Sequence, residues 1–403
     1  MLFSKSKGKG ILTPQMEGIL GNPVWLVGVF AMGACIGSFL NVVIYRVPLG
    51  LSVNKPRRSF CPVCKKEIPW YRNLPILTWI LQRGKCAECR APIPFRYVFV
   101  EILTALFILA AWVVFVTART PVAPVAAVLV AILGVLLISI SFIDAEHMII
   151  PVLFCYAGMA IGVAGNALDP TLVALGGDAE GMSWWEGGLE AAIGIAAGWG
   201  GLALVVILGK FFLGEKRMKF DKAEEWRLRE PESDEEELSF VIGEERIGWS
   251  DLFYRKGDRI EIDGHGILLD GHRTKATALV IYREFVRIGE KKHLIEEIKS
   301  LSGKADRIVI PREAMGAGDP PLLGMIGAFI GWKGVLFSLF ASCLYALVAA
   351  VLGRIGFGRQ LPFGPFLALG GVTWVFGGWM LWEWYFGTLV GSGLVEPGVG
   401  GGK

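Results

Sequence analysis

The strongest constraint on the fold is a series of apolar stretches, most of them close to the length of about 20 residues that a helix needs to cross a bilayer. We predict eight membrane-spanning helices, of which the sixth is short, at residues 23–47, 97–117, 121–143, 149–167, 188–213, 322–332, 334–353 and 363–386. Of the 403 residues, 53% are hydrophobic and only 19% are charged, which is more apolar than a soluble core requires. The sequence therefore predicts an all-α polytopic membrane protein.

Basic residues in the loops predict the orientation of these helices. The segment 48–96 carries ten Lys and Arg residues, whereas 168–187 carries none. Because loops rich in Lys and Arg stay in the cytosol, we place 48–96 there, and counting helices forward puts Asp144 and the segment 214–321 on the same side. Lys5, Lys7 and Lys9 weigh slightly against this orientation. The net charge of +3 is small and dispersed, which excludes nucleic acid as an expected partner.

Two polar segments interrupt the helices and define the domains. The first is a cytosolic four-cysteine module and the second is a cytosolic insert. The predicted domains are an N-terminal segment (1–22), the first transmembrane helix (23–47), the cysteine module (48–96), transmembrane helices two to five (97–213), the insert (214–313), a glycine-rich turn with helices six to eight (314–392) and a flexible tail (393–403).

The insert is predicted to be a small α+β domain. Residues 259–263 and 307–310 alternate as strands do, Asp263-Gly264 and Asp270-Gly271 are turn signals, and 274–301 shows helical apolar spacing. Its three histidines, which match no metal-binding spacing, are His265, His272 and His293.

Four cysteines predict a zinc site in the module. They form two CxxC pairs separated by 21 residues, Cys61 with Cys64 and Cys86 with Cys89, close to the spacing of zinc ribbons. Two disulfides are the alternative, but a cytosolic loop is reducing, which favours metal. Four sulfur ligands leave no open position for a reacting water, so the expected role of zinc is structural.

Two aspartates at predicted membrane edges are the candidate catalytic residues. Asp144 ends the third apolar stretch, and Asp319 follows the turn that contains Gly316 and Gly318, where a backbone without Cβ can pass close to a substrate or a partner helix. Two carboxylates held close together cannot both ionise easily, so one acts as a base toward water while the other donates a proton to the leaving group. This pair would hydrolyse a peptide bond without a metal.

Each aspartate also has an ordinary structural explanation. Asp319 followed by Pro320 fits a helix N-cap, and Asp144 could simply end a helix in water. The residues alone leave both explanations open.

Several motifs in chain order resemble the type IV prepilin peptidases. They are Gly37-Ser-Phe-Leu-Asn-Val-Val-Ile-Tyr-Arg-Val-Pro48, the two CxxC pairs, Arg96 with Val100-Glu101, Asp144, Glu313-Ala-Met-Gly-Ala-Gly-Asp319 and Leu361-Pro-Phe-Gly-Pro365. The resemblance implies an eight-span GxGD-type aspartic protease of the bacterial inner membrane, with Asp144 and Asp319 as its catalytic pair. It would cut the basic leader of a prepilin or pseudopilin after a Gly at the cytosolic membrane face.

The resemblance also implies a second activity and two further site residues. Many members with the cysteine module methylate the new N-terminus from S-adenosylmethionine, so this cofactor is expected beside zinc. Glu101, about one turn inside the second predicted helix, is a candidate for contact with the leader or for a pair with Arg96.

The chain departs from the family pattern at two places. Pro320 and Pro321 stand where a small residue and a Lys usually follow GxGD, and Pro151-Val152 replaces the usual Pro-Asp. The alternatives are a GxGD protease that acts on other precursors, such as preflagellins, and a non-catalytic zinc-ribbon scaffold of pilus assembly.

Overall fold

The computed structural model describes residues 22–55, 59–61, 63–118, 123–177, 182–213, 215–230, 238–243, 245–253, 258–311, 316–353 and 361–391. The predicted N-terminal segment before Asn22 and the predicted tail lie outside these ranges. The chain forms two compact units, one of Met1–Ala203 with Ala317–Lys403 and the other of Leu204–Gly316.

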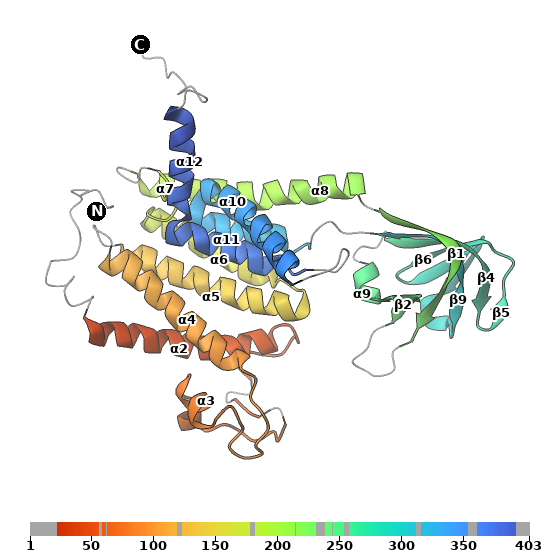
Figure 1. Ribbon diagram of the computed structural model, residues 1–403, viewed down its shortest axis with the longest axis horizontal. Helices are drawn as coiled ribbons and strands as arrows, with labels where there is room; N and C mark the ends of the chain where they lie inside the picture. Colours follow the sequence, from red (N-terminus) through yellow and green to blue (C-terminus); the bar gives the residue numbers. More distant parts are fainter. Residues whose placement is uncertain are drawn as a thin grey trace, which may run out of the picture. The chain divides into compact units, whose positions relative to one another are not determined.

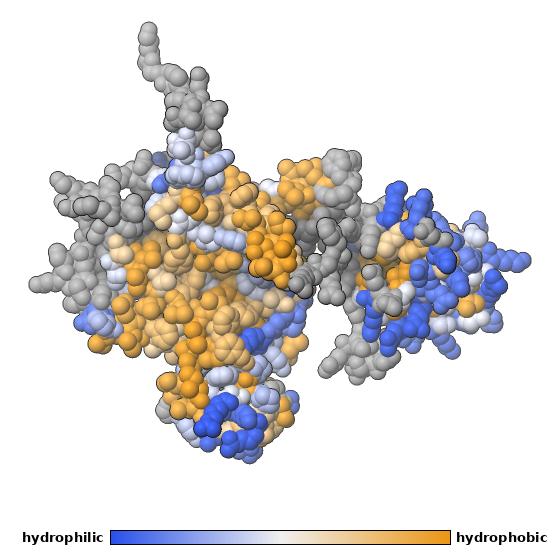
Figure 2. Space-filling view, in the orientation of Figure 1, coloured by the Kyte–Doolittle hydropathy of each residue, from blue (hydrophilic) through white to orange (hydrophobic). Residues whose placement is uncertain are grey.

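The first unit is a bundle of apolar helices (Figure 1). Six helices are long and apolar enough to cross a membrane: Pro23–Arg46 (α2), Arg96–Thr117 (α4 with a π-turn), Pro124–His147 (α5), Trp184–Leu208 (α7 into α8), Asp319–Leu352 (α10) and Gly364–Thr388 (α11 into α12). A shorter apolar helix, α6, spans Val152–Leu168. Figure 2 shows apolar side chains over most of this bundle, as the sequence predicts for a polytopic membrane protein.

The long helix α10 reverses direction at Gly331. This residue has φ 71° and ψ 178°, which are not helical angles and favour glycine. A β-carbon added to Gly327 would lie 2.7 Å from Cγ2 of Val335, whereas residues eight apart in a straight helix are separated by about 12 Å. Asp319–Ile330 and Trp332–Leu352 are therefore two antiparallel arms, which correspond to the sixth and seventh predicted helices.

The first arm of α10 is the most enclosed part of the bundle. Every residue from Asp319 to Gly331 is buried. A β-carbon added to Gly194 of α7 would lie 2.1 Å from the carbonyl oxygen of Gly327, so these two backbones touch directly. At the far end of the arm, the buried Asn166 donates to the carbonyls of Ala328 and Phe329, at 2.9 and 3.2 Å. These bonds satisfy carbonyls that the end of a helix leaves free.

The second unit is a single antiparallel sheet. Its strand order is β3-β2-β1-β9-β4-β6-β7-β8, with β5 paired to β4. The strands are β1 (Glu215–Arg229), β2 (Ser239–Ile242), β3 (Glu245–Gly248), β4 (Arg259–Leu269), β5 (His272–Arg273), β6 (Ala278–Tyr282), β7 (Phe285–Ile288), β8 (Lys291–Leu294) and β9 (Leu301–Pro311). Trp226, Phe240 and Phe253 are the large residues of its core, and hydrophilic side chains cover the outside (Figure 2).

The helix predicted over 274–301 is wrong. This segment forms the strands β6, β7 and β8 and a short 3-10 turn, Ile295–Glu297. In β6 and β7 the buried residues alternate: Leu279 and Ile281 on one strand, Val286 and Ile288 on the next. Buried residues recur every second position within each strand, and a tight turn separates the two strands. Taken along the chain, these positions resemble the apolar spacing of an amphipathic helix. The insert is therefore a β-domain in which the described helical segments are the four-residue α9 (Trp249–Leu252) and this 3-10 turn.

Candidate functional site

The four predicted zinc ligands come together in the module between α2 and α4. The sulfur atoms of Cys61, Cys64, Cys86 and Cys89 all lie within 4.8 Å of one another, so the cluster could hold a metal ion. The sulfurs of Cys61 and Cys89 are 3.8 Å apart. A tetrahedron with zinc–sulfur bonds of 2.3 Å has an edge of about 3.8 Å, so the donor set fits zinc. None of the four forms a disulfide.

Each cysteine pair sits in the same kind of tight turn. In the first, the N–H of Lys65 donates to the carbonyl of Cys61, and in the second the N–H of Arg90 donates to that of Cys86. Lys65 and Arg90 have φ of 59° and 61°, which bends the backbone around the sulfurs. The N–H groups of Cys89 and Glu88 donate to the Cys86 sulfur and lower the pKa of this thiol to about 7. The thiolate therefore forms most readily at Cys86, whereas burial and the neighbouring thiols raise the pKa of Cys89 to about 11.

The module has almost no core of its own. Among its residues whose burial is described, only Cys61 and Gly84 are fully buried. Segments this small seldom bury enough apolar surface to fold unaided. A tetrahedral metal site at the four cysteines would supply the missing cross-link.

Glu101 anchors the module to the membrane helices. Its carboxylate accepts the N–H of Ile76 at 2.7 Å, and Ser38 of α2 also hydrogen-bonds to it. Ile76 precedes the short helix α3 (Leu77–Leu81) and has φ 63°, which is strained for a β-branched residue. The buried carboxylate holds this strained backbone in place. A β-carbon on Gly37 would lie 2.7 Å from Cα of Glu101, so α2 and α4 touch here.

Of the two roles predicted for Glu101, the pair with Arg96 is not formed. Arg96, the first residue of α4, instead forms a salt bridge with both carboxylate oxygens of Glu146 in the last turn of α5. Glu101 lies more than one turn deeper in α4 and faces the module. Arg96 thus ties the exit of the module to the end of α5, two residues beyond Asp144.

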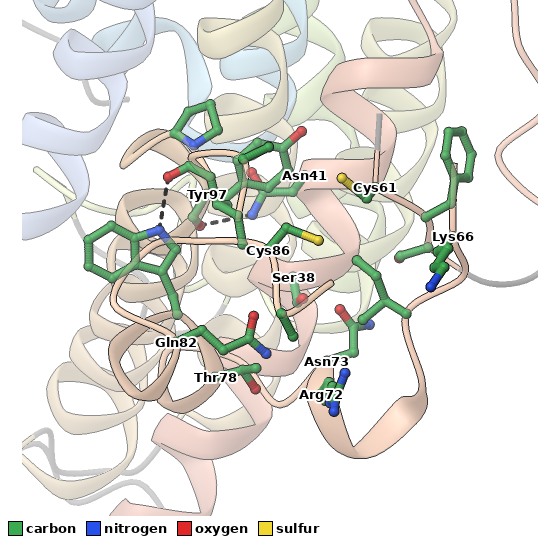
Figure 3. A pocket seen from close by; sticks show the side chains of 18 of the residues that line it. Ser38, Asn41, Cys61, Lys66, Arg72, Asn73, Thr78, Gln82, Cys86 and Tyr97 are labelled. Atoms are coloured by element: carbon green, nitrogen blue, oxygen red, sulfur yellow. Dashed lines mark hydrogen bonds between the residues drawn. The ribbon is translucent and has the colours of Figure 1, made fainter. Parts of the chain in front are cut away.

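A cavity of about 240 Å³ lies between the module and the helices α2 and α4 (Figure 3). The residues that line it include Ser38, Asn41, Trp79, Tyr97 and Glu101. Asn41 donates to the Tyr97 carbonyl at 2.9 Å, and the indole N–H of Trp79 donates to the Ile93 carbonyl at 3.2 Å. Hydrogen bonds therefore fix the aromatic and polar groups around this space before any ligand enters.

Asp144 lies inside the last turn of α5 and is only 5% exposed. Its Oδ2 accepts the N–H of Gly364, the first residue of α11 (Gly364–Thr373), at 3.0 Å. The helix ends at Met148, a left-handed residue whose N–H donates to the Asp144 carbonyl. Sequence reasoning placed this aspartate at the end of an apolar stretch, and the structure shows it enclosed by α11.

Asp319 is the first residue of α10 and is 4% exposed. A β-carbon on Gly318 would lie 2.5 Å from Cβ of Ile150, and one on Gly364 would lie 3.4 Å from Cδ1 of the same residue. Ile150 thus packs against both the turn before Asp319 and the residue that holds Asp144. The two aspartates, 175 positions apart in the chain, lie at the same end of the bundle. Gly316 of the same turn is exposed.

Sequence reasoning missed several residues of these two sites. Ser38 and Asn41 belong to the quoted motif that begins at Gly37, but nothing in one sequence shows that they face the module. The role of Glu146 could not be predicted because its partner, Arg96, lies on another helix. Gly364 carries no side chain to draw attention, although it stands in the Leu361–Pro365 motif.

The fold and these sites define a polytopic membrane protein with a four-cysteine module on its helix bundle and two buried aspartates at one end. Two family models match it, the bacterial Peptidase A24 N-terminal domain at residues 31–115 and the type IV leader peptidase family at residues 285–351. The chain belongs to the type IV leader peptidase family, a family of peptidases.

Three relatives give the extent of this similarity. The prepilin leader peptidase/N-methyltransferase of Aeromonas hydrophila is 32% identical over 226 residues, which cover 76% of that protein and 45% of this chain. That of Klebsiella pneumoniae is 32% identical over 174 residues, with 73% and 40% covered. The Myxococcus xanthus protein of the same name is 42% identical over 150 residues, but the match spans only 42% of its length and 37% of this chain. No solved structure matches the chain.

Proposed function

We propose that this protein removes the basic leader of type IV prepilins or pseudopilins with Asp144 and Asp319 as its catalytic pair. The observation that carries the proposal is the burial of both carboxyl groups at one end of the bundle, where Ile150 packs against Gly318, next to Asp319, and against Gly364, which binds Asp144. Burying an ionisable carboxyl group costs free energy, so buried acids in membrane helices are functional candidates. The names of the relatives supply the substrate class.

The pair would hydrolyse the peptide bond by acid–base exchange. A water molecule attacks the scissile carbonyl carbon while the ionised carboxylate takes one of its protons. The protonated carboxyl group delivers its proton to the amide nitrogen as the carbon–nitrogen bond breaks. One water is consumed, and a leader with a C-terminal carboxyl group and a mature protein with a free amine are released.

The proposed topology has eight passes with the reaction at the cytosolic face of the inner membrane. The six long apolar helices become eight when α6 is included and the two arms of α10 are counted separately. The ten basic residues of 48–96 favour a cytosolic module. The Arg96–Glu146 salt bridge joins the end of this module to the α5 turn of Asp144, so both sites lie on that side.

The second proposed activity is methylation of the newly exposed amine. The cavity beside the module offers the chemistry that S-adenosylmethionine requires: aromatic faces for the adenine ring and cation, and the Glu101 carboxylate for its positive charge. Trp79, Tyr97, Ser38 and Glu101 would hold the cofactor, which would supply the methyl group. Zinc at the four cysteines would keep this wall in place and take no part in the reaction.

The proposed function is tested by incubating the purified protein in detergent with a synthetic prepilin and S-adenosylmethionine. Mass spectrometry should show the mature chain, shortened after the leader Gly and heavier by one methyl group. A preflagellin substrate cleaved in preference would favour the other GxGD protease. If the prepilin binds but stays intact, the result would favour a non-catalytic scaffold. Pro320 and Pro321, which depart from the family pattern, suggest this alternative.

Replacement of Glu101 should separate the two activities. In Glu101→Ala the half-buried N–H of Ile76 loses its acceptor, and leaving a fully buried donor unpaired would cost about 1–3 kcal/mol, which is the upper bound here. The wall of the cavity should loosen, so we expect methylation to fall at least about 10-fold while leader cleavage stays within about 3-fold. Both products are counted in one mass spectrum.

The matched control is Glu284→Ala, which removes an exposed glutamate of the β-domain and should change neither product. Equal losses of cleavage and methylation in Glu101→Ala would show that this residue serves the whole fold, and would remove the cavity from the proposal.

A further inference from the structure

The hydrogen bond between Asp144 and α11 is buried on both sides. Gly364 and Asp144 are both buried, and the N–H of Gly364 donates to Oδ2 over 3.0 Å. It joins residues 220 positions apart. A charge-assisted bond of this kind, shielded from water, holds a carboxylate more strongly than an exposed one.

The sequence of α11 leaves this donor free for the aspartate. The first turn of a helix has N–H groups without helical partners. In α11, Pro365 has no N–H, and the N–H groups of Phe366 and Leu367 both donate to the Phe363 carbonyl at 3.1 Å. The N–H of Gly364 is the remaining donor of this turn, and it points at Asp144.

Only glycine allows this approach. A β-carbon at position 364 would lie 2.6 Å from Oδ2 of Asp144 and 3.2 Å from its Cγ. Ile150 closes another side, with Cδ1 3.4 Å from the same point. A side chain here would push the carboxylate away from its place or move the start of α11.

We propose that Gly364 is a positioning residue for the peptidase reaction, and this inference rests on the proposed function. Its N–H holds one oxygen of Asp144, so that the other oxygen is left to take the proton of the attacking water. A backbone N–H binds an ionised carboxylate better than a neutral acid. This hydrogen bond favours the ionised form of Asp144, which is the form that a base requires.

The first test compares Gly364→Ala with Gly387→Ala. Gly387 lies in α12 and has nothing within 4 Å of its β-carbon position, so its variant controls for a glycine replaced within a helix. Displacing a reacting group by about 1 Å costs about 100-fold in rate. We expect kcat for leader cleavage to fall about 100-fold in Gly364→Ala, with KM unchanged, and to stay at the wild-type value in Gly387→Ala.

The second test removes the donor and nothing else. Glycolic acid introduced at position 364 by nonsense suppression replaces the N–H by an ester oxygen without adding atoms that clash. Loss of a hydrogen bond to a charged group should lower kcat about 10- to 100-fold with unchanged KM, in protein that is still folded at the assay temperature. This variant decides the question if Gly364→Ala does not fold.

The outcomes separate the inference from the proposed function. A wild-type protein that leaves prepilin uncut overturns both. Cleavage by the wild type together with a wild-type kcat in the ester variant overturns the role of Gly364 alone. If the fall in kcat follows the loss of folded protein, Gly364 has a purely structural role. A fall in kcat with a matching rise in KM leads to the same conclusion. Either result overturns the inference.

Discussion

Replacing either aspartate by asparagine should abolish leader cleavage while leaving the protein folded in the membrane. In Asp144→Asn the side chain can still accept the N–H of Gly364 but can no longer take a proton from water. In Asp319→Asn the second carboxyl group of the acid–base exchange is missing. General acid–base groups contribute about 10²- to 10⁴-fold, so we expect a rate loss of that size in each variant. The measurement is the rate of release of mature pilin in detergent.

The control for these variants is Asp306→Asn. Asp306 is an exposed aspartate of the β-domain, 58% accessible and paired with His265, and its replacement should leave the rate unchanged. Melting temperatures close to the wild-type value in all three variants would show that chemistry, and not folding, was lost. Cleavage at the normal rate by either active-site variant would end the assignment of the pair.

Loss of one cysteine ligand should release zinc and unfold the module. Cys61 is the most buried of the four. Its module has almost no apolar core that could keep it folded without the metal. Structural zinc contributes about 10–16 kcal/mol of apparent folding free energy in zinc-finger peptides, which a segment of this size cannot replace by packing. We therefore expect Cys61→Ser to contain no zinc, to be cut within 48–96 by protease, and to lose methylation.

Cys343→Ser provides the matched control, because Cys343 is an exposed cysteine in the second arm of α10 and outside the cluster. It should keep its zinc, measured by elemental analysis of the purified protein. A wild-type protein without zinc would contradict the metal site directly. A zinc-free Cys61→Ser variant that still resists protease would show that the module folds by other means.

The helices could be predicted from the sequence because hydrocarbon imposes a simple rule on them. A spanning helix must be apolar over most of its length, and that requirement is local. Even the division of α10 was predicted, as the two separate stretches 322–332 and 334–353. In the β-domain no such rule applies, and three strands separated by short turns imitated the periodicity of a helix.

The partners of the site residues could not be predicted in the same way. Both Glu101 and Glu146 are acidic residues that could pair with Arg96. The packing of α4 against α5 brings Glu146 to it, and this contact cannot be read from the sequence. Glu101 accepts the backbone N–H of Ile76, and a backbone partner of this kind leaves no pattern in the sequence. The cysteines were easier, because the spacing of a metal site is written along the chain while a helix-to-helix contact is not.

The enclosure of the first arm of α10 decides what can move Asp319. This arm is about 18 Å long, shorter than the hydrocarbon layer of about 30 Å, and it is buried from Asp319 to the reversal at Gly331. Lipid acyl chains therefore do not touch it, and its height is fixed by Asn166 at one end and α7 along its side. We therefore expect a bilayer that thickens or thins to tilt the outer helices before it displaces this arm and Asp319.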